Sequence, residues 1–259
     1  MLPAPELSDA VLVHELPPAE NPFPELSVSA RFEELGKGRR GTTLTRVDET
    51  TGAVPLVRTT NRYAHPAQHF GAVHRRLAEL IRERAALPLG FNNALVECYT
   101  NAYAKMGAHS DQALDLADGS HIAVFSCYEH PEADPPRRLL VESKESGDTL
   151  EVPLTHNGFV VFSVEENRRL KHRIVLGSPS RRTENRWLGL TFRTSKTLVR
   201  FHDGHPHLPR GDRLTLADED QQRDFFRMRR QENTEPDFTY PPLTYTVSPS
   251  DLLPPVSPG

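Results

Sequence analysis

Short runs rich in β-branched and aromatic residues dominate the middle of the chain, and they most constrain its fold. Turn residues separate the runs, and their spacing favours an antiparallel sandwich or barrel over βαβ units. The expected strands are Ala94–Tyr99, Ile122–Tyr128, Arg138–Ser143, Thr149–Pro153, Phe159–Ser163, His172–Leu176 and Trp187–Thr194. We therefore expect a mainly β fold with flanking helices.

Two segments have the periodicity of a helix. In the first, His69 to Ala85, apolar residues recur on one face and arginines on or near the other, which we interpret as a solvated surface. The apolar set is Phe70, Val73, Leu77, Leu80 and Ile81, and the arginines are Arg75, Arg76, Arg82 and Arg84. A second helix is expected from Ala217 to Gln231, with Phe225, Phe226 and Met228 as its apolar residues.

Prolines gather at both ends, before about Glu25 and from Pro236 onward. Since proline disfavours helix interiors and central strands, we expect extended arms packed on a core, or disordered tails. We divide the chain into an N-terminal extension or lid (1–53), a β core (54–200) and a C-terminal helix with a proline-rich tail (201–259).

Charge and composition restrict the location and partners of the protein. The 31 basic and 35 acidic residues give a net charge of −4, so no global positive field attracts nucleic acid or membranes. The two cysteines, Cys98 and Cys127, lie in expected strands without metal-ligand spacing, and we expect buried thiols. The N-terminal sequence does not resemble a signal peptide, and no apolar run approaches the ~20 residues of a membrane span. We expect a cytoplasmic protein.

A histidine and a carboxylate two residues apart form the first candidate metal-binding pair. His109-Ser-Asp111 precedes a strand, whereas His130-Pro-Glu132 lies in a proline-rich loop that controls side-chain direction poorly. In an extended segment, residues i and i+2 point to the same side and can present both groups to one ion. Taken alone, the pair also fits an ordinary hydrogen-bonded turn.

A third ligand is required from a distant strand, because an Fe(II) site that binds oxygen uses two histidines and a carboxylate on one face. His172 opens an apolar strand and is the best candidate, although a histidine at a strand edge can also be structural. His156 lies in a turn, and a Gly/Pro-rich loop holds His202, His205 and His207.

The last expected strand offers a site for an organic anion. With a period of two, Thr191 and Arg193 share a face with Trp187, whereas Arg186 falls on the other face. An inward arginine can bind a carboxylate in bidentate fashion, so Arg193 with Thr191 is the expected anchor. The alternative is an arginine that extends to solvent at a strand end.

From Val54 to Ser195 the chain resembles the AlkB-like branch of the Fe(II)/2-oxoglutarate-dependent dioxygenases. The resemblance rests on the order and spacing of several short segments. They are PLVRTTNRY, the amphipathic helix, FNNALVECYTNAYAKMGAHSD, HIAVFSCYE, VPLTHNGFVVFS, LKHRIV and RWLGLTFRTS.

The resemblance implies a double-stranded β-helix (jelly-roll) core with His109, Asp111 and His172 as ligands of Fe(II). It further implies that Arg193 binds the distal carboxylate of 2-oxoglutarate and that Tyr99 lies near this co-substrate. O2 would be the oxidant, with succinate and CO2 as products.

Three departures from the family pattern concern the substrate side. Glu97 stands where the family usually has asparagine, and Trp187 stands where it has a second arginine. An Asn-x-Tyr occurs instead at Asn101–Tyr103. The lid region before Tyr63 contains basic residues but few aromatic ones, whereas repair enzymes of the family carry basic and aromatic elements there to hold a flipped base.

We therefore expect a dioxygenase that hydroxylates a small polar or anionic metabolite, for example in biosynthesis. The alternatives are an oxidative demethylase of nucleic acid or nucleotides, which the net charge and the lid disfavour, and a non-catalytic jelly-roll binding module.

Overall fold

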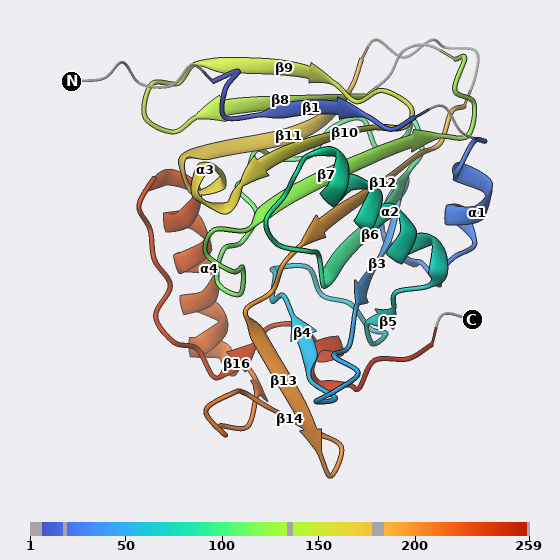
Figure 1. Ribbon diagram of the computed structural model, residues 1–259. Helices are drawn as coiled ribbons and strands as arrows, with labels where there is room; N and C mark the ends of the chain where they lie inside the picture. The colour runs from blue at the N-terminus through green and yellow to red at the C-terminus, as the bar shows by residue number, and fades with distance from the viewer. Residues whose placement is uncertain (1–6, 18–19, 134–136, 178–183, 258–259) are drawn as a thin grey trace.

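Two β-sheets face each other in the computed structural model, which describes residues 7–17, 20–133, 137–177 and 184–257 (Figure 1). The large sheet has the strand order β1 (Leu12–Glu15), β10 (Gly158–Ser163), β7 (His121–Tyr128), β12 (Trp187–Arg193), β6 (Asn93–Tyr99), β3 (Arg39–Thr45) and β2 (Glu33–Gly36), and β5 (Gln68–His69) pairs with β3. The small sheet has the order β11 (Leu170–Leu176), β8 (Arg137–Ser143) and β9 (Thr149–Pro153).

Successive strands alternate between the two sheets. β7 lies in the large sheet, β8 and β9 in the small one, β10 in the large, β11 in the small and β12 in the large. Isolated bridges from Lys105 to Val175 and from His109 to His172 add a further segment beside β11. This alternation defines a double-stranded β-helix, so the expected jelly-roll fold is confirmed.

Two hydrophobic cores follow from the alternating side chains of the large sheet. Leu188, Leu190 and Phe192 point to the outer face, where α1 (Phe23–Ser27) and α2 (Ala72–Arg84) cover them. The other core fills the space between the sheets and includes Val124, Val141 and Trp187. Cys98 and Cys127 are buried in the outer core as free thiols, as expected.

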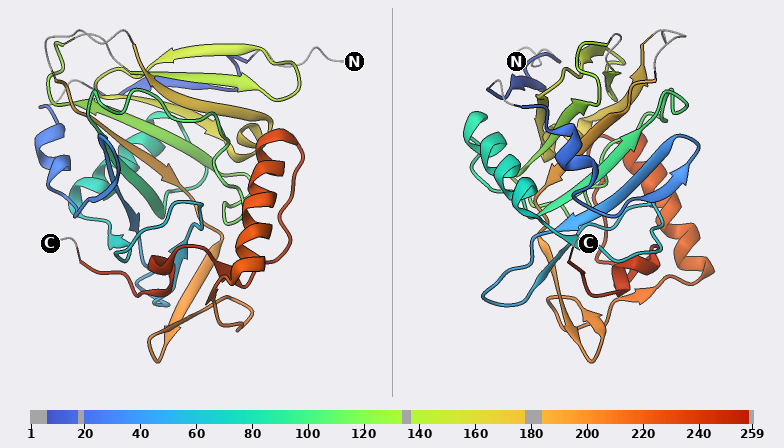
Figure 2. Two further views of the ribbon diagram at one scale, coloured as in Figure 1. Left: turned by 180° about the vertical axis from the view of Figure 1, so that it is seen from behind. Right: turned by 90° about the vertical axis from the view of Figure 1, so that its right-hand side faces the viewer.

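The remaining elements surround one end of the sheets (Figures 1 and 2). β4 (Val54–Leu56), β13 (Thr197–His202) and β14 (His205–His207) form a three-stranded sheet, and β15 (Thr215–Leu216) pairs with β16 (Tyr245–Thr246). The helices there are α3 (Val164–Arg169), the long α4 (Glu219–Thr234) and a 3₁₀ helix at Pro249–Leu252. No helix in the described ranges has the length and apolar character needed to cross a membrane.

The seven expected strands are confirmed to within two residues at each end, whereas the helix predictions need correction. The first helix starts at Ala72 because Gln68–His69 pair with β3 as β5. Leu80, assigned to its apolar face, is 41% exposed. The second helix runs from Glu219 to Thr234 because Asp218 accepts a hydrogen bond from the Gln221 N–H and caps its start.

The proline-rich ends contain short helices and a strand, whereas we expected extended arms packed on a core, or disordered tails. Pro22 and Pro24 lie at the start of α1, and Pro249 begins the 3₁₀ helix, positions where a missing N–H costs little. β1 pairs with β10 at the sheet edge, while residues 1–6 and 258–259 lie outside the described ranges. Since β1, β2 and β3 join the large sheet, residues before 54 contribute to it; the division at 54 and 200 stays a prediction.

A buried ion pair joins the segment after β4 to the loop that follows Asp111. Arg58 donates from Nε and Nη2 to Asp115 at 3.0 and 2.7 Å, and both side chains are at most 4% exposed. Nη1 of Arg58 also donates to the carbonyls of Leu243 and Tyr245 in the C-terminal segment. This guanidinium therefore connects three distant parts of the chain.

We predict that Asp115→Ala lowers the free energy of unfolding by about 3–5 kcal/mol, because it leaves a buried guanidinium without its counter-charge. Glu151→Ala is the control, since it removes a carboxylate from an exposed arginine pair, with side chains 43% and 50% exposed, and should cost under about 1 kcal/mol. Urea denaturation of both variants measures the difference, and equal losses would contradict the prediction.

Candidate metal centre and its cavity

His109 and His172 are brought together by the backbone. The His109 N–H donates to the His172 carbonyl at 2.9 Å, and the His172 N–H donates to the His109 carbonyl at 2.7 Å. Because directly opposed residues of an antiparallel pair project to the same side, their imidazole rings lie 4.8 Å apart. Two residues 63 positions apart in the chain thus face one point.

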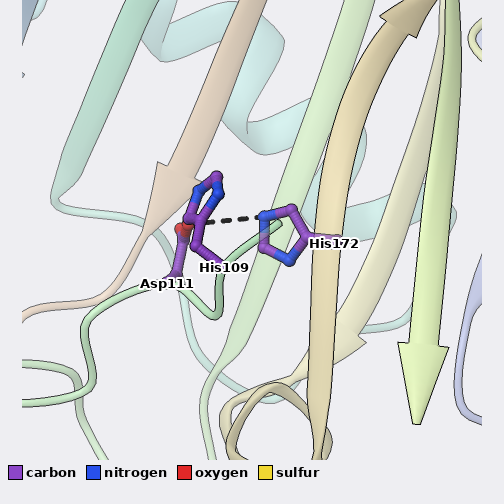
Figure 3. Close-up of side chains that lie close together, drawn as sticks. All are labelled: His109, Asp111 and His172. Carbon is purple, nitrogen blue, oxygen red and sulfur yellow. Dashed lines mark ion pairs between the residues drawn. The ribbon is translucent and has the colours of Figure 1, made fainter. Parts of the chain in front are cut away.

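Asp111 completes a cluster of three possible metal ligands (Figure 3). One nitrogen from each histidine and one oxygen from Asp111 all lie within 4.8 Å of one another. Oδ1 of Asp111 is 3.6 Å from Nε2 of His172 and 3.9 Å from Nε2 of His109. Oδ2 of Asp111 is buried and has no hydrogen-bond partner among the described residues. Two imidazoles and one carboxylate make a donor set that fits a divalent cation such as Fe(II).

The protonation states also suit metal binding. Burial and the neighbouring His172 lower the pKa of His109 to about 4. Burial alone would raise the pKa of Asp111, but His172 and Arg193 hold it below its ordinary value. Nδ1 of His109 lies 2.9 Å from the carbonyl of Gly107; since a carbonyl only accepts, Nδ1 carries the hydrogen and the lone pair of Nε2 remains for a metal.

α3 holds the backbone of Asp111 in place. The Asp111 N–H donates to Oδ1 of Asn167 at 2.7 Å, and Nδ2 of Asn167 donates to the Asp111 carbonyl at 2.7 Å. Asn167 is fully buried, and Oγ of Ser110 donates to the Leu170 carbonyl at 2.7 Å. The segment that carries Asp111 is therefore fixed to the same chain region that carries His172.

α4 holds the other side of this loop. Oδ1 of Asn233 accepts from the Ser110 N–H at 3.0 Å, and Oε1 of Glu232 accepts from the Ala113 N–H at 2.8 Å. Arg229 donates to the Ser110 carbonyl and to Glu232. Sequence reasoning missed these residues and Asn167, because a buried polar group that bonds to a distant backbone leaves no local pattern.

A cavity of about 420 Å³ opens beside the three possible ligands. Its apolar walls include Leu95, Val124, Leu139, Ile174 and Trp187, and its polar lining includes Thr59, Thr60, Asn61, Thr191 and Asn233. Both sheets and α4 contribute residues, so the cavity lies between the sheets and the C-terminal region. Its volume suits a compact ligand.

Arg193 and Thr191 both line the cavity, whereas Arg186 does not. The Arg193 guanidinium is 3% exposed and lies 3.8 Å from Oδ2 of Asp111. It forms no hydrogen bond with any residue in the described ranges, and its Nε is buried. Arg186 donates to both oxygens of Glu129, at 2.8 and 2.6 Å. The assignment of the two arginines to opposite faces is therefore confirmed, while a role in ligand binding stays a prediction.

Tyr99 lies behind the cavity wall and is fully buried. Its hydroxyl donates to Oε2 of Glu97 at 2.5 Å, and its ring packs on Trp187 at 4.8 Å between centroids. Glu97 and Trp187, two of the three departures from the family pattern, both line the cavity. Tyr99 thus contacts the cavity through Glu97, and its proximity to a co-substrate stays a prediction.

The other candidate histidines lie outside the cluster. His156 accepts a hydrogen bond from the Tyr128 N–H at 3.1 Å in its turn. His130 bonds through its backbone to Asn185. In the described part of the chain, His202, His205 and His207 on β13 and β14 belong to no group of metal ligands.

No protein-family model and no curated protein matches the sequence. Among solved structures, OsALKBH1 matches with a TM-score of 0.39 and 17% identity over 64% of this chain and 85% of that one. A prolyl-4-hydroxylase of Pseudomonas putida matches with a TM-score of 0.40 and 13% identity over 71% of this chain and 92% of that one. At such scores, neither likeness bears on activity or substrate.

We predict that Asn167→Ala weakens divalent metal binding about 10–100-fold, because residues that orient metal ligands contribute on this scale. Anaerobic calorimetry with Fe(II) measures the effect. The control is Asn185→Ala, since Asn185 makes the same reciprocal pair of bonds to the backbone of His130 in another loop. Wild-type affinity in Asn167→Ala, or an equal loss in the control, would contradict the prediction.

Proposed function

We propose that the protein is an Fe(II)/2-oxoglutarate-dependent dioxygenase that hydroxylates a small polar or anionic metabolite. The observation that carries the proposal is one cavity in which three possible ligands of a cation lie beside a buried guanidinium. His109, Asp111 and His172 supply the ligands for the cation, and Arg193 supplies a buried guanidinium without a hydrogen-bond partner among the described residues. A keto acid that chelates a metal and carries a second carboxylate needs both the metal ligands and the guanidinium.

When bound, Fe(II) would supply the centre at which O2 oxidises 2-oxoglutarate to succinate and CO2, with one oxygen atom entering a substrate C–H bond. The residues of the chain prepare this site. His109, Asp111 and His172 would hold the ion. Arg193 and Thr191 orient the distal carboxylate, and the apolar residues Val124 and Leu139 keep water from that part of the cavity.

The charges around the cavity support an anionic substrate. Four arginines line it: Arg39, Arg193, Arg229 and Arg230. Glu97 neutralises Arg39, and Glu232 neutralises Arg229. Arg193 lies inside, whereas Arg230 is exposed at the rim and forms no ion pair with any described residue. A co-substrate at Arg193 leaves Arg230 for a carboxylate or phosphate of the substrate.

A nucleic-acid demethylase is the second candidate. A flipped base could enter a cavity of this volume, but binding of a duplex neutralises several phosphates, and this chain has a net charge of −4. A non-catalytic binding module is the third candidate, although it does not require two histidines, a carboxylate and a buried arginine in one cavity.

We predict that Arg193→Lys raises the apparent requirement for 2-oxoglutarate severalfold or more, because lysine keeps the charge but loses the bidentate geometry. Arg186→Lys is the matched control on the other face of the same strand region. Succinate release during 2-oxoglutarate titrations measures both variants. A larger defect in Arg186→Lys would assign the anchor to Arg186.

We also predict that a small metabolite with a carboxylate or phosphate stimulates succinate release, and that Arg230→Ala raises its KM severalfold. Arg227→Ala serves as the control, since Arg227 lies on the same helix, pairs with Asp224 and does not line the cavity. Screening should include nucleotides and methylated single- and double-stranded oligonucleotides over a salt series. Tight, salt-sensitive oligonucleotide binding with methyl removal would favour the demethylase.

A further inference from the structure

Two arginines on the inner face of the large sheet differ in what they bind. Arg193 lies opposite Asn93 at one end of β6, and Arg39 lies opposite Tyr99 at the other end. The two positions are six residues apart along β6, a distance of roughly 20 Å. Both side chains line the cavity, yet only the Arg39 guanidinium is hydrogen-bonded to a carboxylate.

Glu97 supplies that carboxylate from within the cavity. Nε of Arg39 donates to Oε1 of Glu97 at 2.8 Å, and Nη2 of Arg39 donates to the same oxygen. The Tyr99 hydroxyl donates to Oε2 at 2.5 Å. Both oxygens therefore have donors, and the Glu97 side chain is only 9% exposed. A guanidinium with a tyrosine hydroxyl is also a set of donors that would bind the carboxylate of a ligand.

Two glycines flank Glu97 in the sheet and leave room for the side chains around it. Gly41 on β3 and Gly189 on β12 lie directly opposite it. A Cβ at Gly41 would be 2.8 Å from Leu35 and 3.3 Å from Cγ of Glu97, and a Cβ at Gly189 would be 2.0 Å from the indole of Trp187. A larger residue at Gly41 would displace Leu35 and crowd the Glu97 stem, and one at Gly189 would displace the indole of Trp187.

The charges of Arg39 and Glu97 balance each other, and Tyr99 stays neutral beside them. Burial would lower the pKa of Arg39, but Glu97 raises it above its ordinary value. Burial raises the pKa of Tyr99, and Glu97 raises it further, so the phenol keeps its hydrogen and remains a donor. Another anion at this end of the cavity would meet the negative charge of Glu97 and find the donors already engaged.

We propose that Arg39 and Tyr99 form a second carboxylate-binding subsite, which Glu97 fills from within the chain. Glu97 thereby excludes external anions from this end of the cavity and directs them to Arg193 and the rim. The consequence for the choice of keto acid and substrate rests on the proposed oxygenase function, whereas the subsite itself does not. Glu97 is then a specificity-determining residue.

Chemical rescue tests the subsite without iron or turnover. Glu97→Ala vacates it, so acetate should bind there and raise the Tm of the variant by a few degrees in a saturable way, with chloride at equal ionic strength as the salt control. Trp187 is the single tryptophan and packs on Tyr99, so its fluorescence should report the same binding curve. Wild type and Glu151→Ala keep Glu97 in place, so acetate can reach only Arg193 in them, and both responses should be clearly smaller than in Glu97→Ala.

The double variant Glu97→Ala/Arg39→Ala should fall back to the wild-type acetate response, since the Arg39 guanidinium is gone. An equal response in wild type, in Glu151→Ala or in the double variant would overturn the proposal, as would its absence in folded Glu97→Ala.

If Glu97→Ala does not fold, Glu97→Gln provides the test. Its neutral amide leaves Arg39 uncompensated, so 2-oxoglutarate should quench Trp187 at severalfold lower concentration than in wild type, and an unchanged or higher concentration would overturn the proposal.

Failure of the oxygenase proposal has a different signature. In that case the acetate responses of Glu97→Ala persist, while wild type with Fe(II) and 2-oxoglutarate releases no succinate. An acetate response of Glu97→Ala no larger than that of wild type, alongside normal succinate release, rejects the subsite alone.

Discussion

The reciprocal backbone hydrogen bonds between His109 and His172 are the constraint on which the rest of the site depends. They fix the chain before Asp111 against β11, so that two imidazoles and a carboxylate converge. Polar groups then hold the loop from both sides. Asn167 of α3 binds it on one side, and the C-terminal part of α4 binds it on the other. The C-terminal region is therefore part of the site, because it carries one wall of the cavity as well as hydrogen bonds to the loop.

Charge compensation organises the cavity in the same way. Arg39 and Arg229, which line the cavity, are matched by carboxylates of the chain itself, as is the buried Arg58 outside its lining. A buried charge without such a partner is costly. The unbonded guanidinium of Arg193 therefore indicates a place where an anionic ligand would bind. Its closest charged neighbour is a possible metal ligand at 3.8 Å, so a bound anion would satisfy it and lie next to the metal.

The sequence predicted the parts of this arrangement that depend on local periodicity. Alternation placed Thr191 and Arg193 on the inner face of β12, and the i, i+2 rule placed His109 beside Asp111. Strand β3, with the sequence RRGTTLT, was not recognised because glycine and arginines interrupt its pattern, and tertiary pairing with β6 decides its conformation. Glu97 contacts Arg39, 58 residues away, and Asn167 contacts Asp111, 56 residues away. These contacts depend on how distant segments align, and no single stretch of sequence encodes them.

The central claim is that one metal ion and one keto acid bind side by side in this cavity. An anaerobic titration with Fe(II), followed by 2-oxoglutarate, tests it most directly, because a keto acid that chelates ferrous iron produces a visible charge-transfer absorption. We expect one Fe(II) per chain and an absorption band that appears only after 2-oxoglutarate is added and is lost in His172→Ala. Absence of the band in wild type, or a band of equal strength in His172→Ala, would contradict the account.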